Sequence, residues 1–201
     1  MEISITQIYN ARNNLLDILK ERGYDVSDYN NCGINTVGAM MDTDQLDLLL
    51  THSSGKQLFV RYNIYKKLDL FSLVAYLFEE KKILKNTDDL MVIVKNEPND
   101  TLLSNIDTVW NEQGIYVSVV NIYRLQFNIL KHTQVPKHEI LTEEEKEHLF
   151  LAHHIKSVDD LPSISRYDPV ALVLCMRPGM VCKIHRKSKT SVVSMYYRAC
   201  V

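Results

Sequence analysis

The sequence is poor in the residues that build disulfide frameworks, metal sites and phosphate loops. Among 201 residues it has only four cysteines, with no Cys-x-x-Cys pair, and only six glycines. A zinc site would need ligands in pairs at short spacing, so none is indicated. A chain of this length buries a core without covalent staples, so we expect Cys32, Cys175, Cys182 and Cys200 to be reduced thiols, mostly in the core. So few glycines also leave little material for a phosphate-cradling loop.

The sequence has no excess of positive charge and no long apolar run. Lys plus Arg is 23 and Asp plus Glu is 25, so the formal net charge is −2. That balance excludes a basic field over the whole protein that would hold nucleic acid by charge alone. No stretch approaches the ~18 apolar residues of a membrane span, and residues 1–6 lack the basic and apolar regions of a secretory signal. We expect an intracellular, soluble chain of one or two domains, since a domain averages roughly 150 residues.

The charge is unevenly spread along the chain. No acidic residue follows Asp168, so the last 33 residues carry +6 and the first 168 carry −8. This split favours an acidic body and a basic C-terminal face that meets something negative. The alternative is a solvated surface whose cations pair with the acidic run Glu143–Glu147 of the same protein.

The first 130 residues alternate between helical and strand patterns. Ile8, Ala11, Leu15 and Leu19 follow one helical face that Gly23 ends. Residues 24–56 have no clear period, although a short helix could form around 43–50. We then expect strands over 57–64, 90–95 and 115–122, helices over 68–84 (with Phe71, Val74, Ala75 and Phe78 on one side) and 101–111, and an edge strand at 127–130. This β-α-β-α-β order favours a small, largely parallel sheet with covering helices.

A second region begins between residues 130 and 136. Thr142 and Glu145 form a capping box that predicts a helix over 143–153. Residues 177–180 (RPGM) indicate a turn, and 181–185 and 191–198 alternate like the two strands of an antiparallel hairpin.

Residues with the spacing of a catalytic or metal site are missing. A metal-dependent nuclease on a strand-helix fold needs an Asp followed by an Asp/Glu-x-Lys on the next strand. Here Asp44 and Asp47 precede a strand without acid or lysine, and Ile93 occupies the place of the acid before Lys95. His148, His153 and His154 do not match a His-Glu-x-x-His zinc helix and are better placed on a helix surface. We expect no catalytic residue, no metal ligand and no cofactor.

Six sequence blocks in the C-terminal region follow one another in a recognisable order. They are 135–138 (VPKH), 141–146 (LTEEEK), 161–164 (LPSI), 168–171 (DPVA), 177–184 (RPGMVCKI) and 188–191 (SKTS). This set closely resembles the assembly domain of the fifth subunit of eukaryotic DNA-directed RNA polymerases, a family with a short counterpart in archaeal polymerases. The N-terminal region is similar to the jaw domain of the eukaryotic type, through 19–24 (LKERGY) and the strand-helix alternation.

The resemblance implies an α/β (α+β) protein of two domains. Residues 1–130 would form a jaw with a small mixed sheet covered by helices, similar to inactive nuclease-type domains, and residues 131–201 a small α+β assembly domain. The chain would be a non-catalytic polymerase subunit that docks on the largest subunit, with a small neighbouring subunit as a second contact, while the jaw lies along downstream duplex DNA. It would have no membrane or small-molecule partner. It would act in the nucleus if cellular, and in the virion or a cytoplasmic virus factory if carried by a large DNA virus.

The resemblance also implies which residues meet partners. For subunit docking they are Pro136, His138, Asp168, Pro169, Val170, Arg177, Gly179, Lys183, Arg186, Tyr197 and Arg198, and for proximity to DNA they are Lys95, Asn96 and Pro98. The arginines can bind a carboxylate through two parallel hydrogen bonds, a bidentate geometry that lysine cannot form.

The sequence departs from the family pattern at two loops. Ser191-Val192 stands where the family usually has a glycine after Ser-x-Thr, and the loop 96–100 keeps its proline but is acidic, which disfavours phosphate contact there. Two other functions stay open: a nuclease-fold enzyme that processes nucleic acid, and a stand-alone DNA-binding module.

Overall fold

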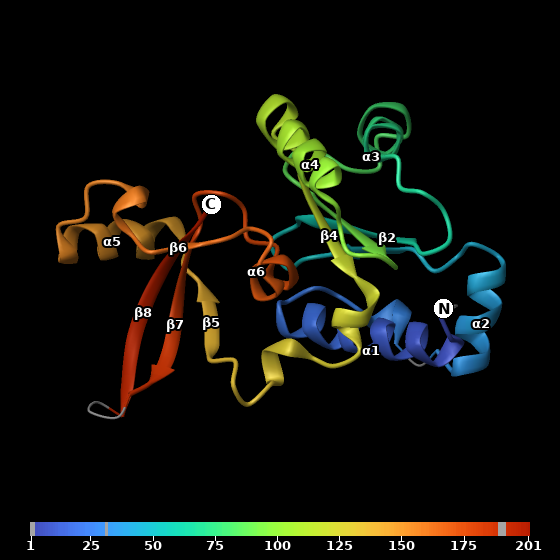
Figure 1. The fold of residues 1–201 in the computed structure, drawn as a ribbon, viewed down its shortest axis with the longest axis horizontal. Coiled ribbons are helices and arrows are strands. Elements are labelled where there is room, and N and C mark those ends of the chain that lie inside the picture. Colours follow the sequence, from blue (N-terminus) through green and yellow to red (C-terminus); the bar gives the residue numbers. More distant parts are fainter. Residues whose placement is uncertain (1–2, 31, 189–191) are drawn as a thin grey trace. The chain divides into compact units, whose positions relative to one another are not determined.

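The computed structural model describes residues 3–30, 32–188 and 192–201. The chain divides into two compact units, Met1–Asn128 and Ile129–Val201. Each unit contains one four-stranded sheet with helices packed on it (Figure 1). The protein is therefore a mixed α/β (α+β) chain, as the sequence predicts.

The sheet of the N-terminal unit is largely parallel. It runs in the order β1 (Leu48–Thr51), β2 (Gln57–Asn63), β3 (Asp89–Val94) and β4 (Tyr116–Asn121). β2, β3 and β4 are parallel, whereas β1 adds an antiparallel edge. Every residue of β3 and β4 is buried, which explains their unbroken apolar patterns. The three predicted strands and their parallel pairing are confirmed.

Helices cover both faces of this sheet, with α1 and α2 on one side and α3 and α4 on the other (Figure 1). α1 (Ile5–Glu21) starts at a capping box between Ser4 and Gln7 and buries the predicted apolar face. α4 (Asp100–Gln113) starts at Asn99, whose side chain accepts the Leu102 N–H, and ends at Gly114 with φ 67°. Both predicted helices are confirmed.

The region 24–56 is more ordered than its composition indicates. It holds a 3₁₀ turn, η1 (Ser27–Tyr29), the helix α2 (Ile34–Asp42) and strand β1. The predicted helix at 43–50 is wrong: Asp44 adopts the left-handed conformation (φ 57°), and Leu48 and Leu50 are buried while Leu49 is exposed. Pairing with β2 imposes the strand period on a sequence whose local propensity is ambiguous.

Two further predictions in this unit need correction. The predicted helix 68–84 is a short α3 (Leu70–Val74) followed by a π-helical η2 (Ala75–Glu80). The buried residues of this segment are Leu70, Val74, Leu77 and Phe78, so the predicted Val74 and Phe78 lie on the buried face, whereas Phe71 is 46% exposed instead of lying in the core. The predicted edge strand at 127–130 is wrong, because a 3₁₀ turn, η4 (Ile129–Lys131), packs Ile129 and Leu130 on the core of the C-terminal unit.

The sheet of the C-terminal unit is mixed. Its order is β5 (Lys137–Ile140), β7 (Val181–Lys187), β8 (Val193–Cys200) and β6 (Ser163–Ile164). β7 and β8 form the predicted antiparallel hairpin. The predicted start of its second strand at Ser191, and the turn 189–191, lie outside the described residues.

A helix packs on each face of this second sheet. α5 (Glu143–His153) starts at the predicted Thr142–Glu145 capping box and places Leu149 against Val181 and Ala199. α6 (Pro169–Leu174) starts at Asp168, with the proline at its first turn, and packs on Cys182 and Cys200. Because side chains alternate along a strand, even-numbered residues of β7 and β8 face α6 and odd-numbered ones face α5.

The cysteines behave as predicted. Cys175, Cys182 and Cys200 are buried and Cys32 is half-buried, all as free thiols. Burial raises the pKa of Cys200 to about 11, which makes it an unreactive core residue. Among the described residues, no helix has the length and apolarity that a membrane crossing requires.

Candidate subunit interface

A groove with a cavity of 760 Å³ lies on the α6 side of the C-terminal sheet. Its walls come from the segment 133–138, the start of α6 and the outer halves of β7 and β8. Six of the residues predicted to dock a partner line it: Pro136, His138, Asp168, Val170, Arg186 and Arg198. The fold thus brings together residues that lie up to 62 positions apart in the sequence.

Local contacts fix the polar residues of this groove. The Asp168 carboxylate accepts the Val170 N–H at 2.9 Å and thereby starts α6. Arg198 donates from Nη1 to the carbonyl oxygen of Ser163 at 2.8 Å, and its guanidinium carbon lies 5.7 Å from the centre of the Tyr196 ring. His138 is held by a 2.7 Å hydrogen bond between Nδ1 and the carbonyl of Pro136. These side chains are therefore positioned before any partner arrives.

The groove combines an apolar floor with cationic walls. Ile164, Val170 and Ile184 are buried beneath it. Within residues 3–30, 32–188 and 192–201, no carboxylate forms an ion pair with Arg186, Lys187 or Arg198. The alternative reading of the basic C-terminal charge, pairing with the run Glu143–Glu147, does not apply to these three. An apolar floor and unneutralised arginines suit an acidic polypeptide that carries an apolar anchor.

The face of β5 and β7 that holds the odd-numbered side chains includes an acidic residue, Glu139. Glu139 lies 2.5 Å from Lys137 Nζ and 2.8 Å from His185 Nε2. The hydrogen bond from Lys137, followed by that from His185, lowers the pKa of Glu139 to about 2. Glu139 therefore offsets the charge of Lys137, and the free positive charge of the groove comes from Arg186, Lys187 and Arg198.

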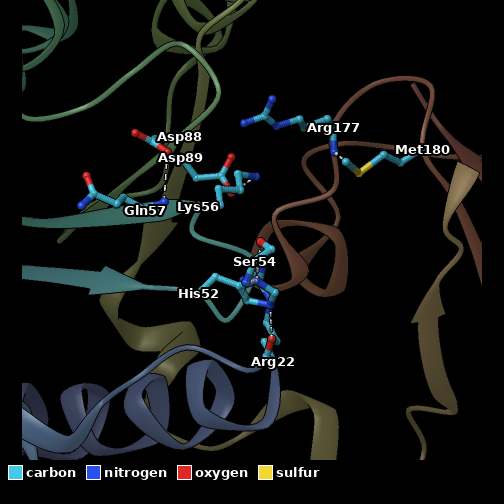
Figure 2. Close-up of polar contacts among 9 residues, drawn as sticks. All are labelled: Arg22, His52, Ser54, Lys56, Gln57, Asp88, Asp89, Arg177 and Met180. Carbon is cyan, nitrogen blue, oxygen red and sulfur yellow. Dashed lines mark hydrogen bonds and ion pairs between the residues drawn. The ribbon is translucent and has the colours of Figure 1, made fainter.

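Five predicted docking residues lie away from the groove lining. Pro169 is the first residue of α6. Lys183 and Tyr197 form a cross-strand pair on the α5 face, where Tyr197 packs on the Leu149 cluster. Arg177 and Gly179 belong to the turn before β7; Gly179 has φ 86° and donates its N–H to the Cys200 carbonyl, and the Arg177 N–H points to Met180 Sδ at 3.4 Å (Figure 2).

Sequence reasoning missed several residues of the groove, among them Val135, Ile184 and Tyr196. The signal was present in the hairpin, where Ile184 and Arg186, like Tyr196 and Arg198, share a face through the period of two. Strand β5, by contrast, has no alternation that would separate it from a loop, and only its pairing with β7 reveals it.

A second cavity, of 660 Å³, lies at the carboxyl ends of β2 and β3 in the N-terminal unit. Its lining includes the three residues predicted to lie near DNA, Lys95, Asn96 and Pro98, together with Lys66 and Lys67. Glu97 of the acidic loop forms a two-pronged ion pair with Arg124, at 3.0 and 3.1 Å. The negative charge of this loop is thus partly neutralised. The other charged residues that line the cavity are lysines.

The amino ends of β2 and β3 are closed by polar contacts (Figure 2). The Gln57 N–H donates to Asp88 at 2.9 Å, and Lys56 pairs with Asp89 at 2.5 Å. The ring of His52 spans Ser54 and the carbonyl of Arg22, at 2.7 and 2.9 Å. These contacts tie the β1–β2 turn to the end of α1 and to the start of β3.

The two aspartates considered for a nuclease site have structural partners. Asp47 pairs with Arg61 and accepts the Tyr62 N–H, and Asp44 lies 3.2 Å from Lys66 Nζ. Over the described part of the chain, no three His, Cys, Asp or Glu side chains are grouped to hold a metal ion.

Comparison with known proteins decides the family. Residues 127–200 match the model of the RNA polymerase Rpb5 C-terminal domain. The DNA-directed RNA polymerase subunit Rpo5 of Thermococcus kodakarensis is 45% identical over 76 residues, which cover 38% of this chain and 92% of that protein. The chain belongs to the Rpb5 family of DNA-directed RNA polymerase subunits.

The Rpb5 relatives fall into a short and a long type. Rpo5 of Archaeoglobus fulgidus, 40% identical over 77 residues, is matched over its whole length by 38% of this chain. DNA-directed RNA polymerase V subunit 5A of Arabidopsis thaliana is 28% identical over 200 residues, covering 94% of this chain and 86% of that protein. The chain thus aligns along nearly its full length with the long type, and the groove lies in the part shared by both.

Proposed function

We propose that the chain is a non-catalytic structural subunit of a multisubunit DNA-directed RNA polymerase, anchored through its C-terminal unit to the largest subunit. In this proposal residues 131–201 are the assembly domain and residues 1–130 the jaw. The location follows that of the polymerase: the nucleus if the chain is cellular, the virion or virus factory if it is viral.

One observation carries the anchoring role: six residues singled out for docking converge on one groove. Its floor is apolar, and its arginines have no carboxylate partner among the described residues. Arginine-rich, partly apolar surfaces supply the energetic centre of many protein interfaces. The groove also lies in the unit that the short archaeal relatives retain.

We propose that the jaw lies along downstream DNA with the lysine-lined cavity facing the phosphates. Lys66, Lys67 and Lys95 line the cavity at the end of the sheet; Arg124 offsets Glu97, and Asp44 lies 3.2 Å from Lys66 Nζ. Lysines placed in this way contribute sequence-independent phosphate contacts. The overall negative charge of the first 168 residues means that such contacts depend on the polymerase holding DNA in place.

Affinity purification of the tagged full-length chain from its native source tests the proposal. We expect the two largest polymerase subunits in the eluate at the stoichiometry of a complex. An eluate without either large subunit, or metal-dependent cleavage of nucleic acid by the purified chain, would contradict it.

A further inference from the structure

The outer edge of strand β8 has no partner strand along most of its length. β6 pairs only with Ala199 and Cys200, at the end of β8. On that side of β8, from Val193 to Tyr197, the described residues place no strand. Figure 1 shows β7 between β5 and β8, with β8 at the border of the hairpin.

The backbone of this edge points outward at alternate residues. The N–H groups of Ala199 and Val201 donate to Pro162 and Ile164 at 2.9 and 3.0 Å, so odd-numbered positions face the β6 side. Backbone groups alternate in direction along a strand. Val193, Met195 and Tyr197 therefore present N–H and C=O groups to the open edge, whereas Ser194, Tyr196 and Arg198 bond toward β7.

This edge lacks the devices that protect exposed strands. The stretch Val193–Tyr197 contains no charged residue and no proline, and three of its five residues are exposed: 50% for Val193, 45% for Met195 and 39% for Tyr196. Natural proteins usually block such edges with lysine, proline or a covering segment, because an open edge templates pairing with another chain. The edge of β8 from Val193 to Tyr197 is therefore open to pairing with another strand.

The two faces beside the edge differ in chemistry. On one face Tyr196 and Arg198 lead into the groove with Arg186. On the other face Val193 and Met195 offer apolar side chains. A strand laid beside β8 would place alternate residues over these two faces.

We propose that β8 accepts one extended strand of a polymerase partner subunit by strand addition, and that this strand alternates acidic with apolar residues. The proposal deepens the anchoring role above and rests on it. Main-chain hydrogen bonds to Val193, Met195 and Tyr197 supply affinity. Carboxylates over Arg198 and Arg186, with apolar side chains over Met195, supply specificity.

Charge favours a foreign strand over a second copy of this chain. No acidic residue follows Asp168, so a second β8 would add another acid-free strand that carries Arg198. Like charges would meet without any compensating carboxylate.

Residue-resolved amide hydrogen exchange of the full-length chain tests the pairing directly. The probe is the acetylated peptide EVEVEVEVE, and its matched control is KVKVKVKVK. We expect the first peptide to slow exchange at Val193, Met195 and Tyr197 by at least about tenfold, while Ser194, Tyr196 and Arg198 are protected with and without it. Unchanged exchange at the three odd positions, equal protection by the lysine peptide, or protection that rises with protein concentration alone would overturn the proposal.

Two substitutions at Met195 test strand addition in the assembled polymerase. Met195→Pro removes an outward N–H that no described residue of the C-terminal unit accepts, and proline is tolerated at such edge positions. Met195→Thr keeps the N–H and a side chain suited to strands. We expect about tenfold less large subunit recovered with Met195→Pro and near wild-type recovery with Met195→Thr, with both variants folded by circular dichroism.

The outcomes separate the two proposals. Equal recovery with both Met195 variants would refute strand addition and leave the anchoring role intact. Absence of the large subunits from the wild-type eluate would refute the anchoring role itself. Should Met195→Pro prove unfolded, the exchange experiment on the wild-type chain decides.

Discussion

Glu139 and His185 lie across the β5–β7 pair, with Oε2 of the carboxylate 2.8 Å from Nε2 of the ring. The other carboxylate oxygen holds Lys137. Glu139 therefore offsets part of the positive charge on the odd-numbered face of β5 and β7. Arg186 and Arg198, on the other face, have no carboxylate partner among the described residues.

The same contact predicts an acid-sensitive component of stability. The pKa of Glu139 is lowered from 4.5 to about 2, so its contribution is present above pH 4.5 and is lost as the pH falls toward 2. We expect the melting temperature of Glu139→Gln to fall less over that range than that of the wild type. Thermal melting from pH 6 to 2 measures it, with the exposed Glu147→Gln as control; parallel curves for all three proteins would contradict the assignment.

Two leucines on α5 provide a matched test of packing. Leu149 is buried against Val181 and Ala199, whereas Leu151 is 75% exposed. We expect Leu149→Ala to lower the free energy of unfolding by about 2–3 kcal/mol, from lost burial and the cavity left behind. Leu151→Ala should change it by less than about 0.5 kcal/mol. Urea denaturation of both variants measures the difference, and equal losses would show that α5 does not pack as described.

Asp168 caps α6 and is also one of the proposed docking residues, and one pair of variants separates these two roles. Asp168→Ala removes the cap of α6 and should lower the free energy of unfolding by about 1 kcal/mol. Asp168→Asn keeps an oxygen acceptor and should lower it by only a few tenths of a kcal/mol. Denaturation reports the cap. If the carboxylate itself contributes to docking, recovery of the large subunits should change with Asn at unchanged stability.

The lysine-lined cavity predicts a salt-dependent contact with DNA. In assembled polymerase, we expect Lys95→Ala to weaken binding of downstream duplex about equally for all sequences and to reduce the slope of log affinity against log salt by about 1. Binding measured over a range of salt concentrations checks this, with Lys20→Ala, on α1, as control. An unchanged slope would remove Lys95 from the DNA path.

Parts of this architecture were predictable because local patterns and tertiary structure agree. The apolar face of α1, the buried run of β3 and the Thr142–Glu145 capping box each specify their element from a short window. Strand β1 and the π-helical η2 were not predictable in this way. The first depends on pairing with β2, and the second departs from the usual helical period.

The residues of the candidate site were also predictable only in part. Charge counting located the basic C-terminal region, and the resemblance located its residues. Neither could show that Pro136, Asp168 and Arg198 line one groove, because their proximity depends on how β5, α6 and β8 pair and pack. The open edge of β8 is likewise a property of the sheet order and leaves no mark on composition.

Charge reversal in the groove gives the sharpest test that the C-terminal unit anchors the chain to the polymerase. The full-length chain carrying Arg186→Glu together with Arg198→Glu is expressed, tagged, in its native source beside a control with Lys20→Glu and Lys156→Glu, which makes the same charge change at exposed positions outside the groove. We expect the control to recover both large polymerase subunits like the wild type, and the groove variant to remain folded and to recover at least about tenfold less. Full recovery of the polymerase by the folded groove variant would contradict it.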